Sequence, residues 1–318
     1  MLELIFLIIG FIMIIKASDV LVDSASALAL KLKVPKMLIA LTIVSFGTCA
    51  PEVAISFNSV IDRNGTMAFA NVIGSCIVNV FLIIGIAALV KPIKVKHNTI
   101  KKEIPILLLV TTSFSVLMLD SLFNKNNPNV FSRADGIVLI LLFFMFIAYL
   151  IQLFRGRAVE EVEDSVQIKY DSIPLSIVLL VLSIIMIILS SDVIVTNASK
   201  LAEMFGLSQK IITMTAIVIG TSLPELMLTV SSAKKGEFDM TVGNIIGTNI
   251  FNVCIVLGLP VAIYGDILLE SFSIVDILVV FLTSLELFMF ARSERTISKK
   301  EGTLMVLIFL IYYLYLFI

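Results

Sequence analysis

The sequence predicts an all-α integral membrane protein with ten transmembrane helices, arranged as two inverted five-helix repeats in which helices 2 and 7 are broken. The 318 residues are 59% hydrophobic and only 15% charged, whereas a soluble domain carries about 25% charged residues. Apolar runs of roughly 20 residues, long enough to cross a bilayer, recur along the chain. The two halves also match each other at one fixed spacing, which predicts the repeat.

The apolar runs place the ten helices in order, with polar or charged residues between them. The expected segments are 2–30, 36–60, 67–90, 103–120, 134–154, 173–203, 209–233, 240–264, 272–291 and 302–318. The longest polar break contains an acidic run at 160–164 and is too short for a further domain. We therefore expect a first repeat at 1–154, a cytoplasmic linker at 155–172 and a second, inverted repeat at 173–318.

The distribution of Lys and Arg between alternate loops predicts the orientation, because cytoplasmic loops carry an excess of both. Of the 23 basic residues, seventeen fall on one side of the predicted membrane and five on the other. The richer side is expected to face the cytoplasm. An even number of helices then puts both termini outside a multi-pass protein of the cell membrane, which is the inner membrane where there are two.

An internal repeat predicts the architecture of the bundle. Shifting the chain by 173 residues matches it to itself without a gap over about seventy positions. The matches concentrate on polar residues and helix breakers rather than on Leu and Ile, which argues against a duplication kept only for packing. Because each half holds an odd number of helices, the second half enters the membrane upside down, as in many secondary transporters. The matched pairs are Ser18 with Ser191, Asp19 with Asp192, Gly47 with Gly220, Thr48 with Thr221, Pro51 with Pro224, Glu52 with Glu225, Asn71 with Asn244, Gly74 with Gly247, Asn79 with Asn252 and Gly85 with Gly258.

Each half has a carboxylate and a proline in the middle of an apolar span, Pro51-Glu52 in the first and Pro224-Glu225 in the second. An ionised group at that depth costs at least ~2.5–3.5 kcal/mol and indicates function. Proline lacks an N–H and clashes with the carbonyl four residues back. The carbonyls of Gly47 and Gly220 are therefore expected to be free, beside the carboxylates, as oxygen ligands for a hard cation.

Each half also has a strip of polar residues at a spacing of four, which places them on one helix face. The strips are Asn71, Ser75 and Asn79 in the third helix, and Asn244, Thr248 and Asn252 in the eighth. Hydrogen bonds between helices are the alternative role of such residues. With the broken helices, the strips predict a cage of carboxylate, carbonyl, amide and hydroxyl oxygens, which suits Ca²⁺, Mg²⁺ or Mn²⁺ rather than Zn²⁺ or Cu²⁺.

These motifs resemble the two alpha-repeats of the cation/calcium exchanger superfamily, and most of all those of prokaryotic sodium/calcium exchangers. The resemblance is carried by GTCAPE and GTSLPE with GNIIGTNIFN, and it spans essentially the whole chain. It implies a secondary active antiporter that exchanges Ca²⁺ for Na⁺ by alternating access, with helices 1 and 6 sliding as a unit. It also implies a central Ca²⁺ between Glu52 and Glu225, with the carbonyls of Thr48 and Thr221. Na⁺ sites beside it would use the side chains of Thr48, Ser75, Asn79, Thr221, Ser222, Thr248 and Asn252.

Two positions depart from the family pattern. Cys49 stands where the family usually has serine, as at Ser222, and sulfur is a poor ligand for Na⁺ or Ca²⁺. Asn252 stands where close relatives often have aspartate, so the site has two candidate charges instead of three. Exchange of Ca²⁺, or of another divalent cation, for H⁺ on the same scaffold is therefore the alternative function.

Other classes of function fit the sequence less well. Three cysteines (Cys49, Cys76 and Cys254) match neither a zinc site nor a disulfide framework, and His97, the one histidine, lies in a loop. A Ser/His or Cys/His catalytic pair is therefore not available to an intramembrane hydrolase, and a passive channel would not couple two ions. We expect no enzyme and no cofactor. The expected partners are Ca²⁺, Na⁺ or H⁺ and the lipid bilayer, with no nucleic acid at a net charge of −1 and no inferable protein partner.

Overall fold

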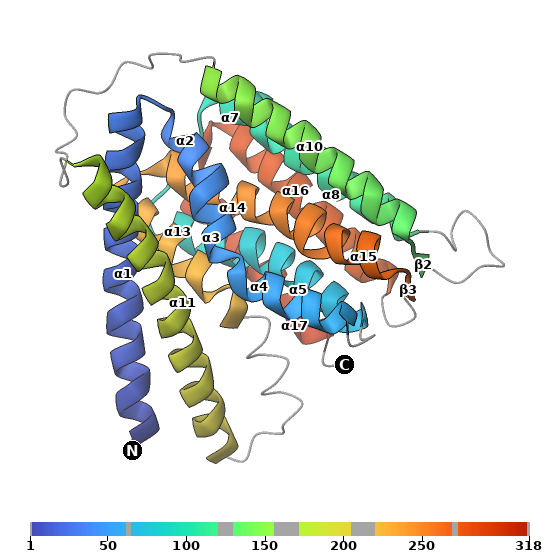
Figure 1. Cartoon of the computed structure of the whole chain (residues 1–318), viewed down its shortest axis with the longest axis horizontal. Helices are drawn as coiled ribbons and strands as arrows, with labels where there is room; N and C mark the ends of the chain where they lie inside the picture. The colour runs from blue at the N-terminus through green and yellow to red at the C-terminus, as the bar shows by residue number, and fades with distance from the viewer. Residues whose placement is uncertain are drawn as a thin grey trace.

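The computed structural model describes residues 2–61, 65–119, 130–155, 172–204, 220–268 and 273–316, and almost all of them lie in helices (Figure 1). Six described helices are long and apolar enough to cross a membrane, and one bent pair makes a seventh candidate. The predicted segments 103–120 and 302–318 form helices of 15 and 17 residues. The first part of segment 209–233 lies outside the described residues. The count of ten spans and the division into two repeats with a linker remain predictions.

The first half begins with α1 (Leu2–Leu32), followed by a bent span and a long interrupted helix. The bent span comprises α2 (Lys36–Ile39), the π-helical segment η1 (Ala40–Val44), α3 (Ser45–Thr48) and α4 (Ala50–Ile61). The interrupted helix comprises α5 (Gly65–Ile77), the π-helical segment η2 (Val78–Ile84) and α6 (Gly85–Val90). After these come β1 (Ile93–Lys94), α7 (His97–Lys101), α8 (Glu103–Leu117), β2 (Val130–Phe131) and α10 (Arg133–Arg155).

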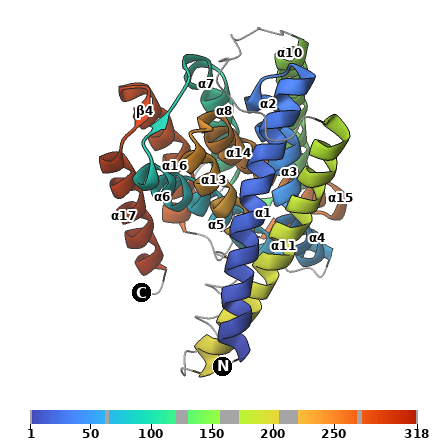
Figure 2. The same cartoon turned by 90° about the vertical axis from the view of Figure 1, so that its left-hand side faces the viewer.

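The described elements of the second half follow one another in the order of their counterparts in the first half. They are α11 (Ile173–Met204), α13 (Leu223–Lys235), α14 (Phe238–Phe251), the π-helical segment η3 (Asn252–Leu257), α15 (Gly258–Tyr264), β3 (Ile267–Leu268), α16 (Ile274–Ser293), β4 (Thr296–Ile297) and α17 (Lys299–Tyr315). In Figure 2 the two chain ends lie toward the same side of the bundle.

The second span bends by 51° between α3 and α4, where Cys49 interrupts the helix. Pro51 has no N–H to continue the hydrogen-bond ladder at this point. In the other half, Ser222 precedes α13 with nearly the same backbone angles, φ −89° and ψ 3° against φ −74° and ψ 3° at Cys49. The break predicted for helix 2 is present, and the part of helix 7 before Gly220 lies outside the described residues.

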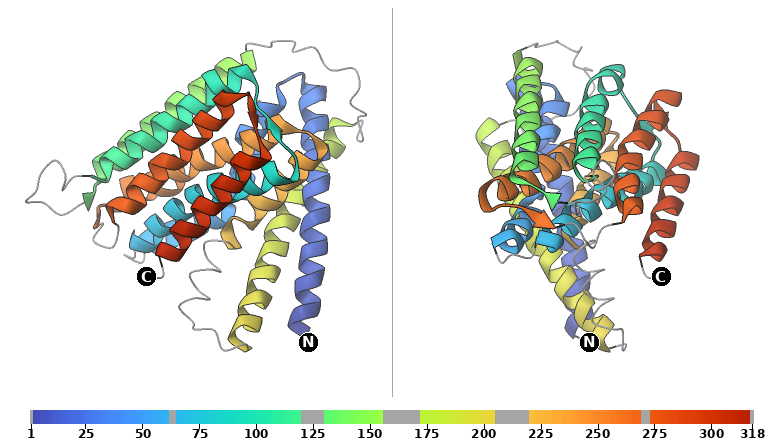
Figure 3. Two further views of the ribbon diagram at one scale, coloured as in Figure 1. Left: turned by 180° about the vertical axis from the view of Figure 1, so that it is seen from behind. Right: turned by 90° about the vertical axis from the view of Figure 1, so that its right-hand side faces the viewer.

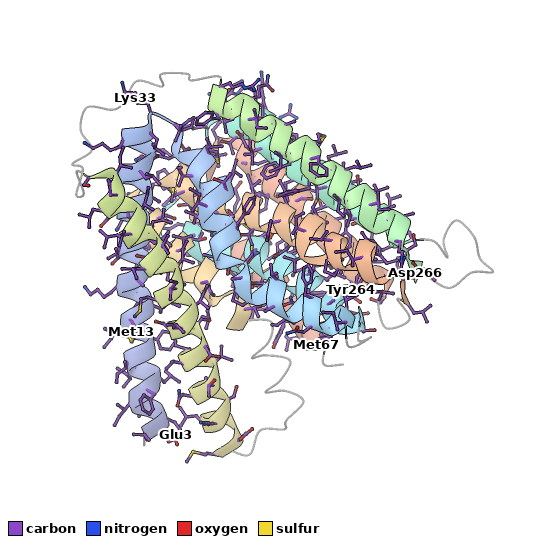
Figure 4. All side chains as sticks on the ribbon, viewed as in Figure 1. Glu3, Met13, Lys33, Met67, Tyr264 and Asp266 are labelled. Carbon is purple, nitrogen blue, oxygen red and sulfur yellow. The ribbon has the colours of Figure 1, made fainter. Side chains whose placement is uncertain are left out.

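The long helices α1 and α11 pack against each other along their length and form a pair at one side of the bundle (Figures 1 and 2). Their buried face forms a smaller apolar cluster, which includes Leu21, Val22 and Ile187 and extends to residues of α2, η1, α13 and α14. A larger apolar core joins most of the remaining helices. Lys33 lies at one end of α1 and Glu3 at the other (Figure 4), so this helix has the length needed to cross a bilayer.

The last helix of each half packs against the other half. Helix α10 packs on α15, and α17 packs on α6, as Figure 3 shows from behind and from the side. Glycines permit both contacts: a Cβ atom on Gly136 would come within 2.7 Å of the carbonyl oxygen of Gly258, and one on Gly302 within 2.8 Å of that of Gly85. Short antiparallel strand pairs, β2 with β3 and β1 with β4, tie the same elements together. Each half therefore completes the packing of the other.

Several hydrogen bonds relate positions 173 residues apart. The hydroxyls of Thr111 in α8 and Ser284 in α16 bond each other at 2.5 Å. Glu103 and Asp276, also 173 apart, each accept a hydrogen bond from a tyrosine of the last helix of their half, Tyr149 and Tyr312. The repeat seen in the sequence rests on identical residues, so it does not include this Glu and Asp pair.

Most of the remaining helix surface is apolar. Leu141 and Phe144 of α10 are 61% and 63% exposed, and many large hydrophobic side chains of α1, α11 and α17 are exposed as well. A contiguous apolar surface of this kind is the surface that lipid tails cover. The bundle is therefore shaped for a membrane.

We expect Gly136→Ala to lower the stability of the folded protein. The added methyl group would meet the backbone of α15 at 2.7–2.8 Å, and overpacking of a tight contact typically costs ~1–3 kcal/mol. Leu141→Ala, on the exposed face of the same helix, is the matched control and should unfold near the wild-type temperature. Thermal unfolding in detergent measures both, and equal midpoints for Gly136→Ala and wild type would contradict the close contact.

Candidate cation-binding site

Two carboxylates are buried in the middle of the bundle. Glu52 lies in the first turn of α4 and Glu225 in the first turn of α13, directly after the two breaks. Both side chains are 0% exposed, and none of their four oxygens has a hydrogen-bond partner among the described residues. The two carboxylates are close enough to interact electrostatically. A buried carboxylate is costly unless it is paired, coordinates a metal or takes up a proton, so this arrangement makes the two glutamates a candidate cation site.

Hydroxyl groups from opposite halves flank the carboxylates. Thr221 lies beside the Glu52 carboxylate, and Thr48 lies beside that of Glu225, although neither contact has the geometry of a hydrogen bond. Thr48 instead donates its hydroxyl proton to the carbonyl of Ser45 at 3.2 Å. The oxygen of Thr48 consequently keeps lone pairs for an ion.

The predicted strip residues are buried as well. Ser75, Asn79, Thr248 and Asn252 are all 0% exposed, and Ser222 is 1% exposed. In each of them at least one side-chain polar atom has no partner among the described residues. All nine predicted site residues are therefore buried. Seven of them contain unsatisfied polar atoms, and the other two are the threonines beside the carboxylates.

The unsatisfied atoms concentrate in this region. Buried polar groups in proteins are almost always hydrogen-bonded, so each exception needs a reason. Of the 17 unsatisfied buried side-chain atoms in the described part of the chain, twelve belong to the predicted ligands or to Asn71 and Asn244. All but one of the twelve, the amide nitrogen of Asn252, are oxygens, the atoms that a desolvated cation would bind.

Asn71 and Asn244 belong to the predicted strips but not to the ligands that the family resemblance implies. Asn71 donates to the Ser56 hydroxyl at 3.1 Å and to the Glu52 carbonyl at 3.3 Å, and Asn244 donates to the Thr229 hydroxyl at 3.2 Å. Both side-chain carbonyl oxygens then have no partner. Ser56 and Thr229 are 173 residues apart, so the repeat extends to the hydroxyls that accept hydrogen bonds from the two amides.

Two other features were not foreseen. Asn79 and Asn252 lie in the π-helical segments η2 and η3, and π-helical turns are frequent at functional sites. The thiol of Cys49 is buried beside both carboxylates and Thr248. A cysteine thus occupies a place in this site where a hydroxyl would be a better ligand for a hard cation.

The prediction that the Gly220 carbonyl has no hydrogen-bond partner was wrong. Pro224 does free the carbonyl of Gly220 from the helix ladder, but this oxygen accepts a hydrogen bond from the Ser191 hydroxyl at 2.9 Å. Ser18, the counterpart of Ser191, instead donates to Ile14 in its own helix at 2.8 Å. The packing of α11 against the second break therefore gives the Gly220 carbonyl a hydrogen-bond donor.

The donor set indicates the kind of ion. Among the described residues, no group of three or more His, Cys, Asp and Glu side chains could hold a metal. Two carboxylates with neutral hydroxyl and amide oxygens remain, a set that suits hard cations rather than zinc or copper.

Comparison with known proteins shows the family of the chain. The family described as sodium/calcium exchanger protein matches residues 2–152 and 175–318. The chain belongs to the sodium/calcium exchanger family. As a member, it is a multi-pass membrane protein of a family of cation exchangers.

Two relatives and one solved structure cover most of the exchanger chain. Inner membrane protein YrbG of Escherichia coli is 35% identical over 264 residues, 81% of this chain and 78% of that protein. Sodium/calcium exchanger MaX1 of Methanosarcina acetivorans is 29% identical over 344 residues, 98% of this chain and 97% of that protein. A structure of the sodium-calcium exchanger NCX_Mj soaked with Na⁺ and Sr²⁺ superposes with a TM-score of 0.82 at 29% identity, covering 98% and 97% of the two chains.

We expect Ca²⁺ to raise the thermal stability of this exchanger. An ion that binds only the folded protein adds about 2.7 kcal/mol at a concentration of about 100 times its dissociation constant. Unfolding midpoints in detergent, with and without Ca²⁺, measure the effect. The double variant Glu52→Gln, Glu225→Gln removes the charge that attracts the ion and should unfold at the same temperature in both conditions. A Ca²⁺ effect of wild-type size in that variant would exclude the two carboxylates as the site.

Proposed function

We propose that the protein is a secondary active antiporter that exchanges Ca²⁺ for Na⁺ by alternating access, with Ca²⁺ held between Glu52 and Glu225. The observation that carries this proposal is the group of four buried carboxylate oxygens without partners, contributed by both halves of the chain. Membership of a family of sodium/calcium exchangers supports the choice of ions.

The charges of the two glutamates explain how one site serves two ions. Together Glu52 and Glu225 carry −2, which compensates one Ca²⁺ or two Na⁺. Ca²⁺ takes ~6–8 oxygen ligands in flexible geometry, and the buried hydroxyl and amide oxygens nearby can complete either set. Because the ions compete for the same oxygens, binding of one displaces the other. The proposed Na⁺ ligands are the side chains of Thr48, Ser75, Asn79, Thr221, Ser222, Thr248 and Asn252.

We further propose ten transmembrane helices in two inverted repeats. The equal order of the described elements in the two halves supports this, as do the Thr111–Ser284 contact and the paired acids at Glu103 and Asp276. In this architecture the two broken helices meet near the bilayer midplane, where the halves of such transporters form their ion site.

The α1–α11 pair is the proposed moving part. It packs on α2, η1, α13 and α14 through an apolar cluster that is separate from the larger core, so a shift of the pair would change contacts in the smaller cluster and leave the larger core closed. The contacts of the pair with the two halves also differ. The Ser191 hydroxyl donates to the Gly220 carbonyl at the second break, whereas the Ser18 hydroxyl donates to Ile14 of its own helix. Asp19 and Asp23 of α1 bond Ser231 and Lys235 of α13. These contacts hold α1 against α13 at the lysine-rich end of α13.

Exchange of a divalent cation for H⁺ is the second candidate. Cys49 beside the carboxylates and the uncharged Asn252 support it, because both weaken Na⁺ ligation relative to a hydroxyl and a carboxylate. Catalysis has less support, since His97 is exposed in α7, at the end of the bundle. We place the protein in the cell membrane with both termini outside, on the strength of the Lys and Arg distribution. The similarity to an inner membrane protein supports the same membrane.

Flux measurements test the coupling ion. In liposomes loaded with Na⁺ and diluted into Na⁺-free buffer, we expect uptake of radiolabelled Ca²⁺, because the outward Na⁺ gradient drives the exchange. Loading with K⁺ at equal ionic strength is the control and should give no uptake. Uptake that follows an imposed pH difference without Na⁺ would contradict Na⁺ coupling and support the H⁺ alternative.

We expect Glu52→Gln and Glu225→Gln each to abolish Ca²⁺ exchange in the same assay. Either change removes half of the charge that compensates Ca²⁺, and loss of one partner of a buried charge pair costs ~3–5 kcal/mol, which is at least about 100-fold in binding. Glu286→Gln is the matched control, since Glu286 is a membrane-embedded glutamate of α16 outside the proposed site. Exchange at the wild-type rate in either site variant would refute the central Ca²⁺ site.

A further inference from the structure

A short chain of hydrogen bonds joins the two predicted strips. The side-chain Nδ2 of Asn79 donates to Oδ1 of Asn249 at 2.8 Å, and Nδ2 of Asn249 donates to the backbone carbonyl of Cys76 at 3.4 Å. All three residues are 0% exposed. Asn249 lies at the end of α14, three residues before Asn252, so it connects the strip of one half to the strip of the other.

These two hydrogen bonds fix the orientation of the side-chain amide of Asn79. A primary amide has a donor end and an acceptor end, and Asn249 binds the donor end. The acceptor end, Oδ1 of Asn79, has no partner among the described residues, and neither has the hydroxyl of Ser75 one turn earlier. If the amide turned over, its N–H₂ group would face the cation in place of the oxygen.

We propose that Asn249 is a positioning residue that holds the carbonyl oxygen of Asn79 toward the cation site. This inference rests on the proposed function, because it concerns the affinity of that same site for its ion. Asn249 itself does not touch the ion. Fixing a ligand in its binding orientation before the ion arrives increases affinity, since less conformational freedom is lost on binding.

The second half supplies the comparison. The counterpart of Asn249, 173 residues earlier, is Cys76, and the counterpart of Asn79 is Asn252. The thiol of Cys76 is only a weak hydrogen-bonding group. In agreement with this, neither the nitrogen nor the oxygen of the Asn252 side chain has a partner among the described residues. Asn79, which is bonded to Asn249, therefore has a fixed amide orientation. Its counterpart Asn252 has no such bond, and the counterpart of Asn249 is a cysteine.

Binding of Ca²⁺ to purified protein in nanodiscs, measured by calorimetry, tests the proposal. We expect Asn249→Leu to raise the dissociation constant by about tenfold, the usual scale of a lost buried hydrogen bond. Asn249→Asp keeps the oxygen that accepts from Asn79 and should bind Ca²⁺ no more than about threefold more weakly than wild type. If Asn249→Leu fails to fold, Asn249→Ala takes its place.

A double-mutant cycle separates positioning from a general structural role. In an Asn79→Ala background, Asn249→Leu should change the dissociation constant by less than about twofold, because Asn249 acts through Asn79. Thr111→Val, which removes another buried bond between helices, should leave Ca²⁺ binding unchanged.

The outcomes are distinguishable. Wild-type affinity in Asn249→Leu, an undiminished effect in the Asn79→Ala background, or an equal loss in Thr111→Val would overturn the positioning role. Wild-type protein that binds no Ca²⁺ would overturn the proposed function together with this inference.

Discussion

The rest of the structure depends on the electrostatics of two carboxylates that have no cationic partner in the described parts of the chain. Glu52 and Glu225 are fully buried, and the ion pairs of the described residues lie elsewhere, such as Lys36 with Glu237. Burial of an uncompensated charge is among the most costly features a protein can contain. In the proposed exchanger, an ion from solution would compensate these two groups, and the neutral oxygens around them would be its remaining ligands.

The helix breaks make that arrangement possible. A regular helix would direct its backbone oxygens along its own axis and leave no carboxylate at a helix start. The break at Cys49 and its counterpart at Ser222 put Glu52 and Glu225 into first turns, where the helix dipole stabilises negative charge. The π-helical segments at Asn79 and Asn252 alter the facing helices in the same region. Irregular backbone at these positions thus lies near the buried carboxylates, inside the protein, where it is tolerated in a membrane.

Packing divides the molecule into two parts with different tasks. Helices exchanged between the halves, and locked by close glycine contacts such as Gly136 on α15, hold the ligands of both halves in one rigid frame. The α1–α11 pair packs through a smaller core and through polar contacts, including Ser191 to Gly220 and Lys235 to Asp23. A few polar contacts exchange more easily than a packed core deforms. The division fits a protein in which one part moves across a fixed site.

The sequence by itself determined the membrane class, the helical segments and the identity of the buried polar residues, because hydropathy, proline and a repeated carboxylate are local signals. The tertiary structure decided which of those groups are left unpaired. Asn79 is held by Asn249 while Asn252 is not, and the Gly220 carbonyl is taken by Ser191. These outcomes depend on side chains far apart in the chain, whose contacts no spacing rule encodes. The π-helical segments were likewise not predictable, since they follow from how one helix packs against several others.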